Sequence, residues 1–547
     1  MAAHGNSNRG LEAGANPDVA FGRFGQMFDL KPASRLPEEG LLDIAMAMIK
    51  TDPGKGIKDS EMIDENPTIP AGYTYFGQFI DHDLTLDTTP LSDAEIDVSA
   101  LVDFRSAALD LDCVYGRGPD DQPYLYDGLK LRVGRKMGSA GATIGTRNDL
   151  LRLTESVPPA KDGREGVPLL GDKRNDENKI VSQIHGALIA FHNKVVGQDA
   201  LLTAFGGDIS SPASRFRAAA MLVRWHYQWV VVHDYLDRIC EPCMKNEVLN
   251  PGGSPRLLHY RKQAAQYAYI PVEFSGAAFR FGHSMVRPSY ALNFAVGTDN
   301  ADTRIPLFSH AADPTKNLNG FPGTLPDDWG VDWGYFLDGD LKPNIGPDFK
   351  VPQPSYRIDA LLVDPLADLP EFRDKGSPFV NLAFRNLERG QMLGLPSGQA
   401  VATELGIVPL PDEILWDAGS SQRDRTKLDA GDTADFEKVR AARAAVRAKW
   451  ADNNGCKLKG STPLWYYILR EAEYYGVTKD PNEPGVGLGG QHLGPVGSRI
   501  VAETLIGLLW YDKNSFLHNT RGFKPMKPIA SDPENFTLDQ LIRYALT

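Results

Sequence analysis

Apolar side chains recur at a spacing of three to four residues along much of the chain, whereas the strict alternation typical of strands is scarce. The strongest such faces lie in residues 180–196 and in the aromatic-rich stretch 214–240. The pattern predicts helices over residues 40–50, 73–84, 180–196, 214–240, 271–286, 434–451, 463–475 and 497–511.

Between these stretches the chain is rich in Gly, Pro, Asn and Asp, which favour loops. Residues 1–72 are predicted to form an N-terminal arm. Residues 85–173 and 291–377 are predicted to be long loops between helices. No internal repeat or low-complexity tract is visible. The sequence therefore predicts a mainly α fold in which residues 73–547 form a single large helical domain with long loops and little β structure.

Composition and charge exclude several classes of protein. The chain has 547 residues, a formal net charge of −13 and a hydrophobic fraction of 42%, as in ordinary globular proteins. Such an acidic balance argues against nucleic-acid binding, which requires a basic face. No run of about 18 apolar residues occurs, so no membrane span is predicted.

The N-terminal stretch lacks the apolar core of a standard secretory signal. The protein is therefore expected in the cytoplasm or outside the cell by a leaderless route, and its short form favours a bacterial source. The sequence does not predict an oligomeric state.

The four cysteines are too few for a disulfide framework at this length. Cys240 and Cys243 form a CxxC pair, but no second pair stands at zinc spacing. They are predicted to be a packed or incidental thiol pair.

A polar cluster marks the helix predicted over residues 73–84. Gln78 and His82 are four residues apart and Asp81 lies three after Gln78, so all three side chains share one helical face. Burying such a set is costly without a purpose. A solvated polar face around a satisfied histidine explains this stretch equally well when it is taken alone.

Five motifs in order along the chain change that balance, because together they resemble the motifs of animal-type haem peroxidases in the peroxidase–cyclooxygenase superfamily. They are the distal-helix motif at residues 77–84, the calcium-loop motif at 109–116, the Arg-x-x-Glu motif at 174–177, the proximal-histidine motif at 279–283, and the segment 386–396 with Asn-Leu-Glu-Arg and Gly-Leu-Pro.

The resemblance implies haem b as cofactor, with His283 as the axial ligand of the iron on a proximal helix over residues 271–287. It places Asn386 behind that histidine, where an amide would orient the ring. Arg280 and Arg389 are candidates for pairing with the haem propionates, and ordinary surface ion pairing is their alternative role.

The resemblance also implies roles around the peroxide. His82 would act as the general acid–base and Arg174 would stabilise charge on the leaving oxygen. Gln78 would hold distal water or an anionic substrate. The implied reaction reduces hydrogen peroxide and oxidises small donors such as halides, thiocyanate or phenols.

Carboxylates at the positions of Asp81 and Glu177 form ester bonds to haem methyl groups in the family. Such bonds are implied here, singly or as a pair. A further sulfonium link in some relatives needs a methionine after the glutamate, where this chain has Asn178.

A calcium site is implied next to the distal helix, in a loop over residues 104–116. The ligands assigned by the resemblance are Asp83, Ser106, the carbonyl of Ala108, Asp110 and Asp112. Oxygen ligands of this kind suit calcium, which takes six to eight of them. A turn with exposed aspartates is the alternative.

Three other functions fit parts of the pattern. A fatty-acid dioxygenase of the same superfamily needs a tyrosine three residues before the proximal histidine, where this chain has Arg280. A haem-bearing adhesion protein would carry an adhesive module, and none is visible. A haem-free binding protein would have no need for His82, Arg174 and His283 together.

Overall fold

The computed structural model describes residues 22–49, 64–86, 98, 101–137, 147–153, 166–261, 268–297, 304–308, 316–320, 325–339, 351–416, 430–451, 458–475, 489–520 and 522–547. Cys456 and all of the first 21 positions of the predicted arm lie outside these residues.

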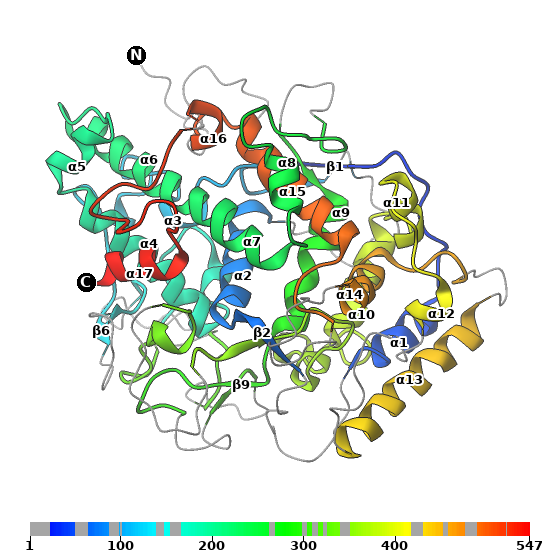
Figure 1. The fold of residues 1–547 in the computed structure, drawn as a ribbon. Coiled ribbons are helices and arrows are strands. Elements are labelled where there is room, and N and C mark those ends of the chain that lie inside the picture. The colour runs from blue at the N-terminus through cyan, green and yellow to red at the C-terminus, as the bar shows by residue number, and fades with distance from the viewer. Residues whose placement is uncertain are drawn as a thin grey trace.

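The described chain is mainly helical, as the sequence predicted (Figure 1). The α-helices are α1 (Glu38–Met46), α2 (Gly72–Leu84), α3 (Asp112–Tyr115), α4 (Lys179–Val195), α5 (Asp199–Ala204), α6 (Pro212–Val230), α7 (Leu236–Ile239), α8 (Met244–Leu249), α9 (Val272–Ser275), α10 (Leu382–Met392), α11 (Gly398–Glu404), α12 (Asp412–Leu415), α13 (Ala430–Trp450), α14 (Leu464–Tyr475), α15 (Pro495–Tyr511), α16 (Phe516–Asn519) and α17 (Leu538–Leu546).

Short turns of tighter or wider helix interrupt the connections. The 3₁₀ segments are η3 (Pro123–Leu125), η4 (Lys173–Asp176), η6 (Ala278–Met285), η9 (Trp333–Tyr335), η10 (Asp364–Ala367) and η11 (Pro370–Phe372), and η5 (Val231–Tyr235) is a π-helix.

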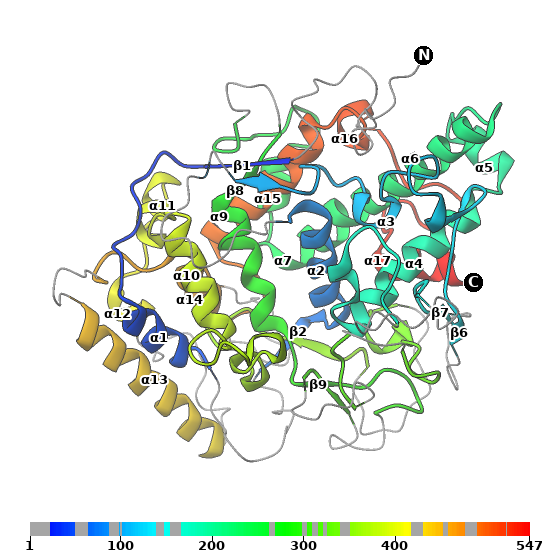
Figure 2. The same ribbon diagram turned by 180° about the vertical axis from the view of Figure 1, so that it is seen from behind.

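Strands are few and short. They are β1 (Gly22–Gly25), β2 (Glu65–Pro70), β3 (Val102–Asp103), β4 (Tyr126–Asp127), β5 (Lys130–Leu131), β6 (Lys136–Met137), β7 (Arg147–Asn148), β8 (Ile270–Pro271), β9 (Ser289–Tyr290), β10 (Ile305–Pro306) and β11 (Pro354–Tyr356). β1 pairs antiparallel with β3 and parallel with β8, which ties residues 22–25 to the rest of the fold (Figure 2).

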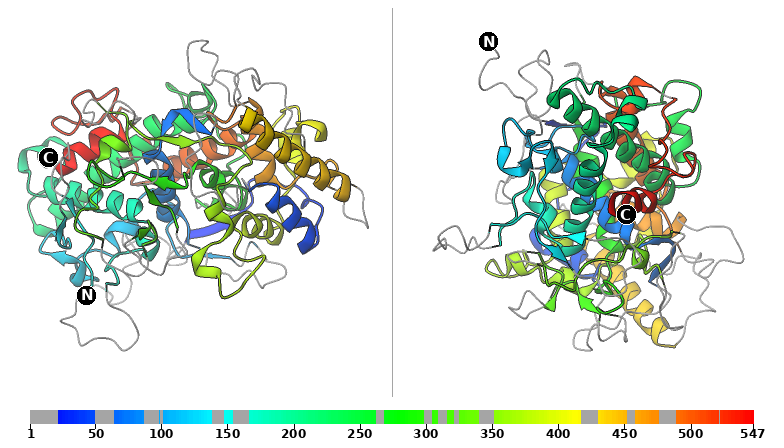
Figure 3. Two further views of the ribbon diagram at one scale, coloured as in Figure 1. Left: turned by 90° about the horizontal axis from the view of Figure 1, so that it is seen from below. Right: turned by 90° about the vertical axis from the view of Figure 1, so that its left-hand side faces the viewer.

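Helix α4 forms the centre of one half of the molecule, where it packs against α2, α6 and α17 (Figure 3). It begins where the Asn178 side chain accepts a hydrogen bond from the Ile180 amide, a cap that satisfies one of the free N–H groups of its first turn. Its buried apolar side chains lie at helical spacing and include Ile180, Ile184 and Leu188.

The predicted helix over residues 214–240 is present as α6, η5 and α7 in succession. Ser211 caps its start and Pro212 occupies the first turn, where a missing N–H does no harm. The π-helical turn widens the helix locally and re-aims the side chains after it. Tyr235, in this turn, consequently lines the same cavity as residues of α2.

The prediction of a continuous helix over residues 271–287 is wrong. The segment forms the four-residue α9 and then the 3₁₀ helix η6. Gly276 has low helix propensity, and Ala277 adopts φ −141°, outside the helical range. The break separates His283 from the apolar turn that precedes it.

The other half of the molecule is built from α10, α14 and α15, with α1 between α10 and α13 (Figure 1). Of the predicted helices, 463–475 and 497–511 are present as α14 and α15. Helices α5, α8, α10, α11 and α17 were not predicted. No helix among the described residues is both long and apolar enough to cross a membrane.

Candidate active site

A cavity of about 890 Å³ lies among α2, η4, η6 and α10. Nine residues that the sequence singled out line it together: Gln78, Asp81, His82, Arg174, Glu177, Arg280, His283, Asn386 and Arg389. Side chains from positions more than 300 residues apart in the sequence thus converge on one space. Its volume lies in the range of ordinary ligand sites, roughly 300–1,000 Å³.

His82 lies on α2, is 3% exposed and is held at both ring nitrogens. Its Nδ1 is 2.9 Å from Asn175 Oδ1, and its Nε2 is 3.2 Å from Glu177 Oε1. Asn175 Nδ2 in turn donates to His185 Nδ1 at 3.0 Å. The two histidines are therefore joined through one amide.

The direction of this chain of hydrogen bonds follows from His185. Burial lowers the pKa of His185 to about 4, so its ring is neutral near pH 7 and one nitrogen accepts. Asn175 donates to that nitrogen through Nδ2, which leaves Oδ1 to accept from the N–H at His82 Nδ1. The Nε2 of His82 is then the nitrogen on the side of the cavity.

Glu177 and Asp81 present carboxylates that are 36% and 37% exposed, and both line the cavity. Gln78 Nε2 donates to Glu177 Oε1 at 2.6 Å. Burial opposes ionisation of Glu177, but the neighbouring His82, Arg174 and Gln78 outweigh it and lower the pKa of that carboxyl group. An ionised Glu177 thus faces the cavity beside His82.

Arg174 is held on one side by Asp172. The Asp172 carboxylate accepts from Arg174 Nη2 at 2.8 Å and from Nε at 3.2 Å, and Nη2 also donates to the carbonyl oxygens of His82 and Thr85. Nη1 lies 4.0 Å from Asp81 Oδ2. The guanidinium is consequently fixed at Nε and Nη2 while Nη1 points along the cavity wall.

His283 lies in η6, and burial together with the Arg280 charge lowers its pKa to about 3, so the ring is neutral. Its Nδ1 is 2.8 Å from Asn386 Nδ2, and Arg280 Nη1 donates to Asn386 Oδ1 at 2.6 Å. The ring of Trp465 meets it nearly edge-on, 6.4 Å away. The sequence expected an amide behind His283 but not the pairing of that amide with Arg280.

Asp83, Asp110 and Asp112 form a cluster next to α2, each with a carboxylate oxygen within 4.8 Å of the others. Burial and the two neighbouring carboxylates raise the pKa of Asp83 well above its usual value. The Ser106 hydroxyl is buried beside Asp110 without a hydrogen bond of ordinary geometry. Ala108 belongs to the same loop.

The backbone between the two loop aspartates adopts an unusual conformation. Leu111 stands between them in the sequence, and its side chain is buried. Its φ of 59° lies in the left-handed region that non-glycine residues seldom adopt. Its amide donates to Asp83 Oδ2 at 3.2 Å. This turn is what brings carboxylates of alternating positions, Asp110 and Asp112, to the same side.

Four residues that hold this site were missed by the sequence analysis: Asn175, His185, Asp172 and Arg105. Asn175 stands inside the Arg-x-x-Glu motif and Asp172 two residues before it, but neither is specified by that motif. Arg105 and His185 carry no local sign of function, because their partners are distant in the sequence.

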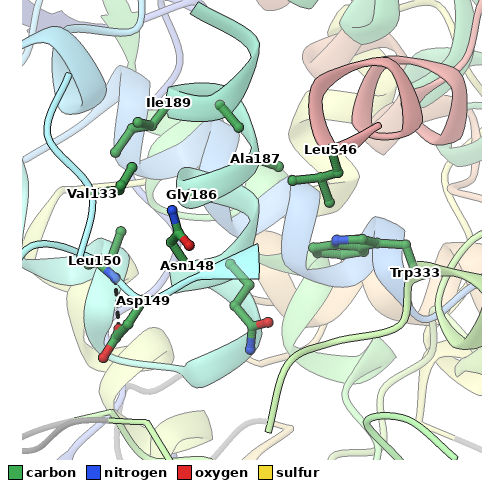
Figure 4. A pocket seen from close by; sticks show the side chains of 11 residues that line it. Val133, Asn148, Asp149, Leu150, Gly186, Ala187, Ile189, Trp333 and Leu546 are labelled. Atoms are coloured by element: carbon green, nitrogen blue, oxygen red, sulfur yellow. Dashed lines mark hydrogen bonds between the residues drawn. The ribbon is translucent and has the colours of Figure 1, made fainter. Parts of the chain in front are cut away.

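A second, smaller cavity of about 40 Å³ lies between α4, Trp333 and Leu546 (Figure 4). Its walls are mostly apolar, and its one carboxylate, Asp149, is paired with Arg152 at 2.9 Å. It offers no group free for chemistry. The CxxC thiols differ in environment, since Cys240 is buried and Cys243 is exposed.

Comparison with known proteins finds one matching family model and several structures of similar fold. Residues 98–325 match the family model described as animal haem peroxidase. The fold is similar to that of peroxidase A from Dictyostelium discoideum, with a TM-score of 0.52 and 14% identity over 96% of this chain and 93% of that one. No curated protein matches the chain.

A second similar structure is the fatty acid alpha-dioxygenase of Oryza sativa. It has a TM-score of 0.50 and 15% identity over 89% of this chain and 75% of that one. At such identities, these two structures establish the fold that they share with this chain, and the reaction has to be argued from the residues in the cavity.

Proposed function

We propose that the chain is a member of the peroxidase–cyclooxygenase superfamily and a haem peroxidase that reduces hydrogen peroxide and oxidises small donors. One observation carries the proposal. Three groups line a single cavity: the His82 imidazole, whose Nδ1 contacts Asn175 and whose Nε2 faces inward, the Arg174 guanidinium fixed by Asp172, and the neutral imidazole of His283. These are the base, the charge stabiliser and the iron ligand that peroxide cleavage requires.

The residues present fit haem. The cavity is large enough for a cofactor, and His283 is neutral, as an iron ligand must be. Arg280 and Arg389 line the cavity and are proposed to receive the two propionates. When bound, haem would supply the redox-active iron through which electrons pass from the donor to peroxide.

His82 is the proposed acid–base group. With Nδ1 held by Asn175, Nε2 takes the proton from peroxide and returns it to the leaving oxygen. Arg174 stays charged and offers Nη1 toward the charge that develops on that oxygen. Gln78 donates to Glu177 Oε1, the same oxygen that lies 3.2 Å from His82 Nε2, and so fixes that carboxylate beside the base.

The proximal amide needs a different orientation when His283 holds iron. If His283 held the iron through Nε2, its ring proton would lie on Nδ1 and would require an acceptor. Asn386 presents Nδ2 to His283 because Oδ1 accepts from Arg280. We propose that Arg280 turns to a propionate and that Asn386 then rotates its oxygen toward His283.

Asp81 and Glu177 are proposed as the ester attachments of haem, since both carboxylates open into the cavity. Acid–organic extraction after turnover with peroxide should leave haem on the polypeptide. Release of all haem from the wild type, as from the Asp81→Ala/Glu177→Ala double variant, would exclude the attachments.

Calcium is the proposed occupant of the cluster of Asp83, Asp110 and Asp112. Three neighbouring carboxylates, two of them buried, repel one another unless a cation or protons neutralise them, and calcium prefers oxygen ligands. The Ser106 hydroxyl, buried next to them, fits the same ion. A cation there would fix Asp83 and, through it, the adjacent His82.

The test of the proposed function mixes haem-loaded protein with stoichiometric peroxide in a stopped-flow spectrometer. A rapid change of the haem absorption band, reversed by bromide, iodide, thiocyanate or a phenol, is expected. His82→Ala should slow that change by about 10²–10⁴-fold, the usual contribution of acid–base catalysis. His518→Ala, on the exposed surface, is the control and should react like the wild type.

Two results would remove the proposal. The first is a wild-type haem band that does not respond to peroxide. The second is a His82→Ala variant as fast as the wild type. Oxygen uptake with a fatty acid in place of peroxide would instead favour the dioxygenase. That outcome is not expected, because Arg280 occupies the place of the required tyrosine and is bound to Asn386.

A further inference from the structure

We infer that Arg105 and Asp172 are positioning residues for Arg174 and that they connect it to the cluster of Asp83, Asp110 and Asp112. The inference rests on the proposed function for the meaning of Arg174, but its geometry is independent of haem. Through these contacts, binding of a cation by the three aspartates would change how firmly Arg174 is held.

The first step is the contact between Asp172 and Arg174. Asp172 Oδ1 accepts from both the backbone N–H and the Nε of Arg174, at 2.9 and 3.2 Å, and Oδ2 accepts from Nη2 at 2.8 Å. A carboxylate that grips one edge of a guanidinium in this way fixes its plane as well as its position. Only the Nη1 edge of Arg174 is left toward Asp81 and the cavity.

The second step is Arg105, which lies on the other side of Asp172. Its Nε is 3.2 Å from Asp172 Oδ2, its Nη1 donates to Asp112 Oδ1 at 3.1 Å, and its Nη2 donates to the Gly171 carbonyl at 3.1 Å. One guanidinium therefore holds the residue that grips Arg174 and also a member of the cation cluster. No other arginine among the described residues contacts both aspartates.

Burial makes these contacts energetically important. The side chain of Asp172 is 1% exposed, that of Asp112 6% and that of Arg105 11%. The two arginines hold the pKa of Asp172 at about 2 despite its burial, so it stays ionised. Removing one partner would leave a buried charge uncompensated, which is far costlier than losing a surface ion pair.

The link to the cluster follows from competition for Asp112. A cation bound by the three aspartates draws on the same carboxylate that Arg105 contacts, and it repels the Arg105 charge. Arg105 then binds Asp172 more closely, and Asp172 holds Arg174 more firmly. Without the cation, Arg105 is shared between Asp112 and Asp172, and the hold on Arg174 weakens.

The experiment reads Arg174 directly in the haem-free full-length protein labelled with ¹⁵N-arginine. The Nε–H resonance of Arg174 is assigned by its loss in Arg174→Lys, and its hydrogen exchange is measured with calcium chloride and with a chelator. In the wild type, calcium should slow the exchange. Arg105→Gln should exchange roughly tenfold faster, the effect of losing one charge-assisted contact, and should no longer respond to calcium.

Matched variants separate positioning from general damage. Arg105→Lys keeps the charge and should restore part of the protection, and Asp172→Asn should lose it. Arg215→Gln removes an exposed pair with Asp199 and should change nothing at Arg174. If Arg105→Gln does not fold, Arg105→Lys and Asp172→Asn carry the test.

An exchange rate at Arg174 that is the same in Arg105→Gln and the wild type overturns the positioning role. A calcium response that persists in Arg105→Gln overturns the link to the cluster. Neither readout needs peroxidase activity. A protein inactive toward peroxide would refute the proposed function, whereas this inference is tested only by the exchange at Arg174.

Discussion

At the scale of single residues, replacing Asn175 is predicted to lower both the stability of the protein and the rate of its reaction with peroxide, although Asn175 touches no substrate. Its amide joins His82 to His185 and fixes which ring nitrogen of His82 faces the cavity. Asn175→Ala leaves the buried His82 Nδ1 without a partner, which costs about 1–3 kcal/mol of stability. The ring is also free to turn, and a misplaced catalytic group slows its step by on the order of a hundredfold.

The measurement for this prediction is the rate of the peroxide-dependent change of the haem band in two paired variants. His185→Gln retains an acceptor for Asn175 and should stay close to the wild type, whereas His185→Phe removes the acceptor and should approach Asn175→Ala. If Asn175→Ala, His185→Gln and His185→Phe all react at the wild-type rate, the orientation of the His82 ring does not depend on Asn175.

The predicted catalytic residues and the residues that hold them differ in how visible they are in sequence. His82, Arg174 and His283 stand in motifs whose spacing carries information. His185 and Arg105 act through partners that only the fold brings near, with Arg105 meeting Asp172 across 67 positions. The sequence could not predict which end of the Asn386 amide faces His283 either, because that depends on the hydrogen bond from Arg280.

At the scale of elements, the contact between α2 and the π-helical turn η5 determines where the distal residues lie. Gly77 comes one position before Gln78 on α2, and a Cβ built there would collide with the Tyr235 hydroxyl of η5. The absence of a side chain lets the two helices approach. Phe76 meets the Tyr235 ring edge-on at 5.7 Å and packs the same contact.

Gly77→Ala is therefore expected to destabilise the protein by about 1–3 kcal/mol, the usual cost of overpacking. Gly186→Ala in α4 is the matched control. Its Cβ would meet only the Asn148 carbonyl, at 3.7 Å, and helix propensity should make it neutral or stabilising by about 0.5–1 kcal/mol. Thermal unfolding of both variants checks the pair, and similar shifts in the same direction would contradict the close approach of α2 and η5.

Helical periodicity predicted elements well where a long apolar face is buried, as in α4 and α15, and failed where the backbone is interrupted. Apolar residues continue on both sides of the break, with Phe274 before it and Phe279 after it, so the pattern could not reveal the interruption at Gly276 and Ala277. The short α10, with Asn386, lies in a stretch of charged residues whose buried face appears only after packing.

In the whole molecule, His226 connects the long helix α6 to the C-terminal segment. It is 0% exposed, its Nδ1 lies 2.7 Å from the Leu222 carbonyl, and its Nε2 accepts from the Met526 amide at 3.1 Å. This pattern is satisfied only by the neutral ring with its proton on Nδ1. A second proton would place two N–H groups against each other between α6 and the segment that leads to α17.

Burial lowers the pKa of His226 to about 4, from a usual value of 6.5. The unfolded chain therefore binds a proton below about pH 6.5 that the folded protein takes up only below about pH 4, and stability falls as the pH drops through that window. His185 and His192, each with a pKa of about 4, act in the same direction. At about 1.4 kcal/mol per pKa unit, each contributes roughly 3 kcal/mol across the window.

The expected result is a thermal unfolding temperature that falls, relative to that of His226→Leu, as the pH drops from 7 to 4, together with faster amide exchange at Met526 in the wild type. His226→Leu should be less stable than the wild type at pH 7, because the Met526 amide loses its acceptor, but should lose less stability on acidification. Parallel pH profiles for the two proteins would show that the ring of His226 is not what acid attacks.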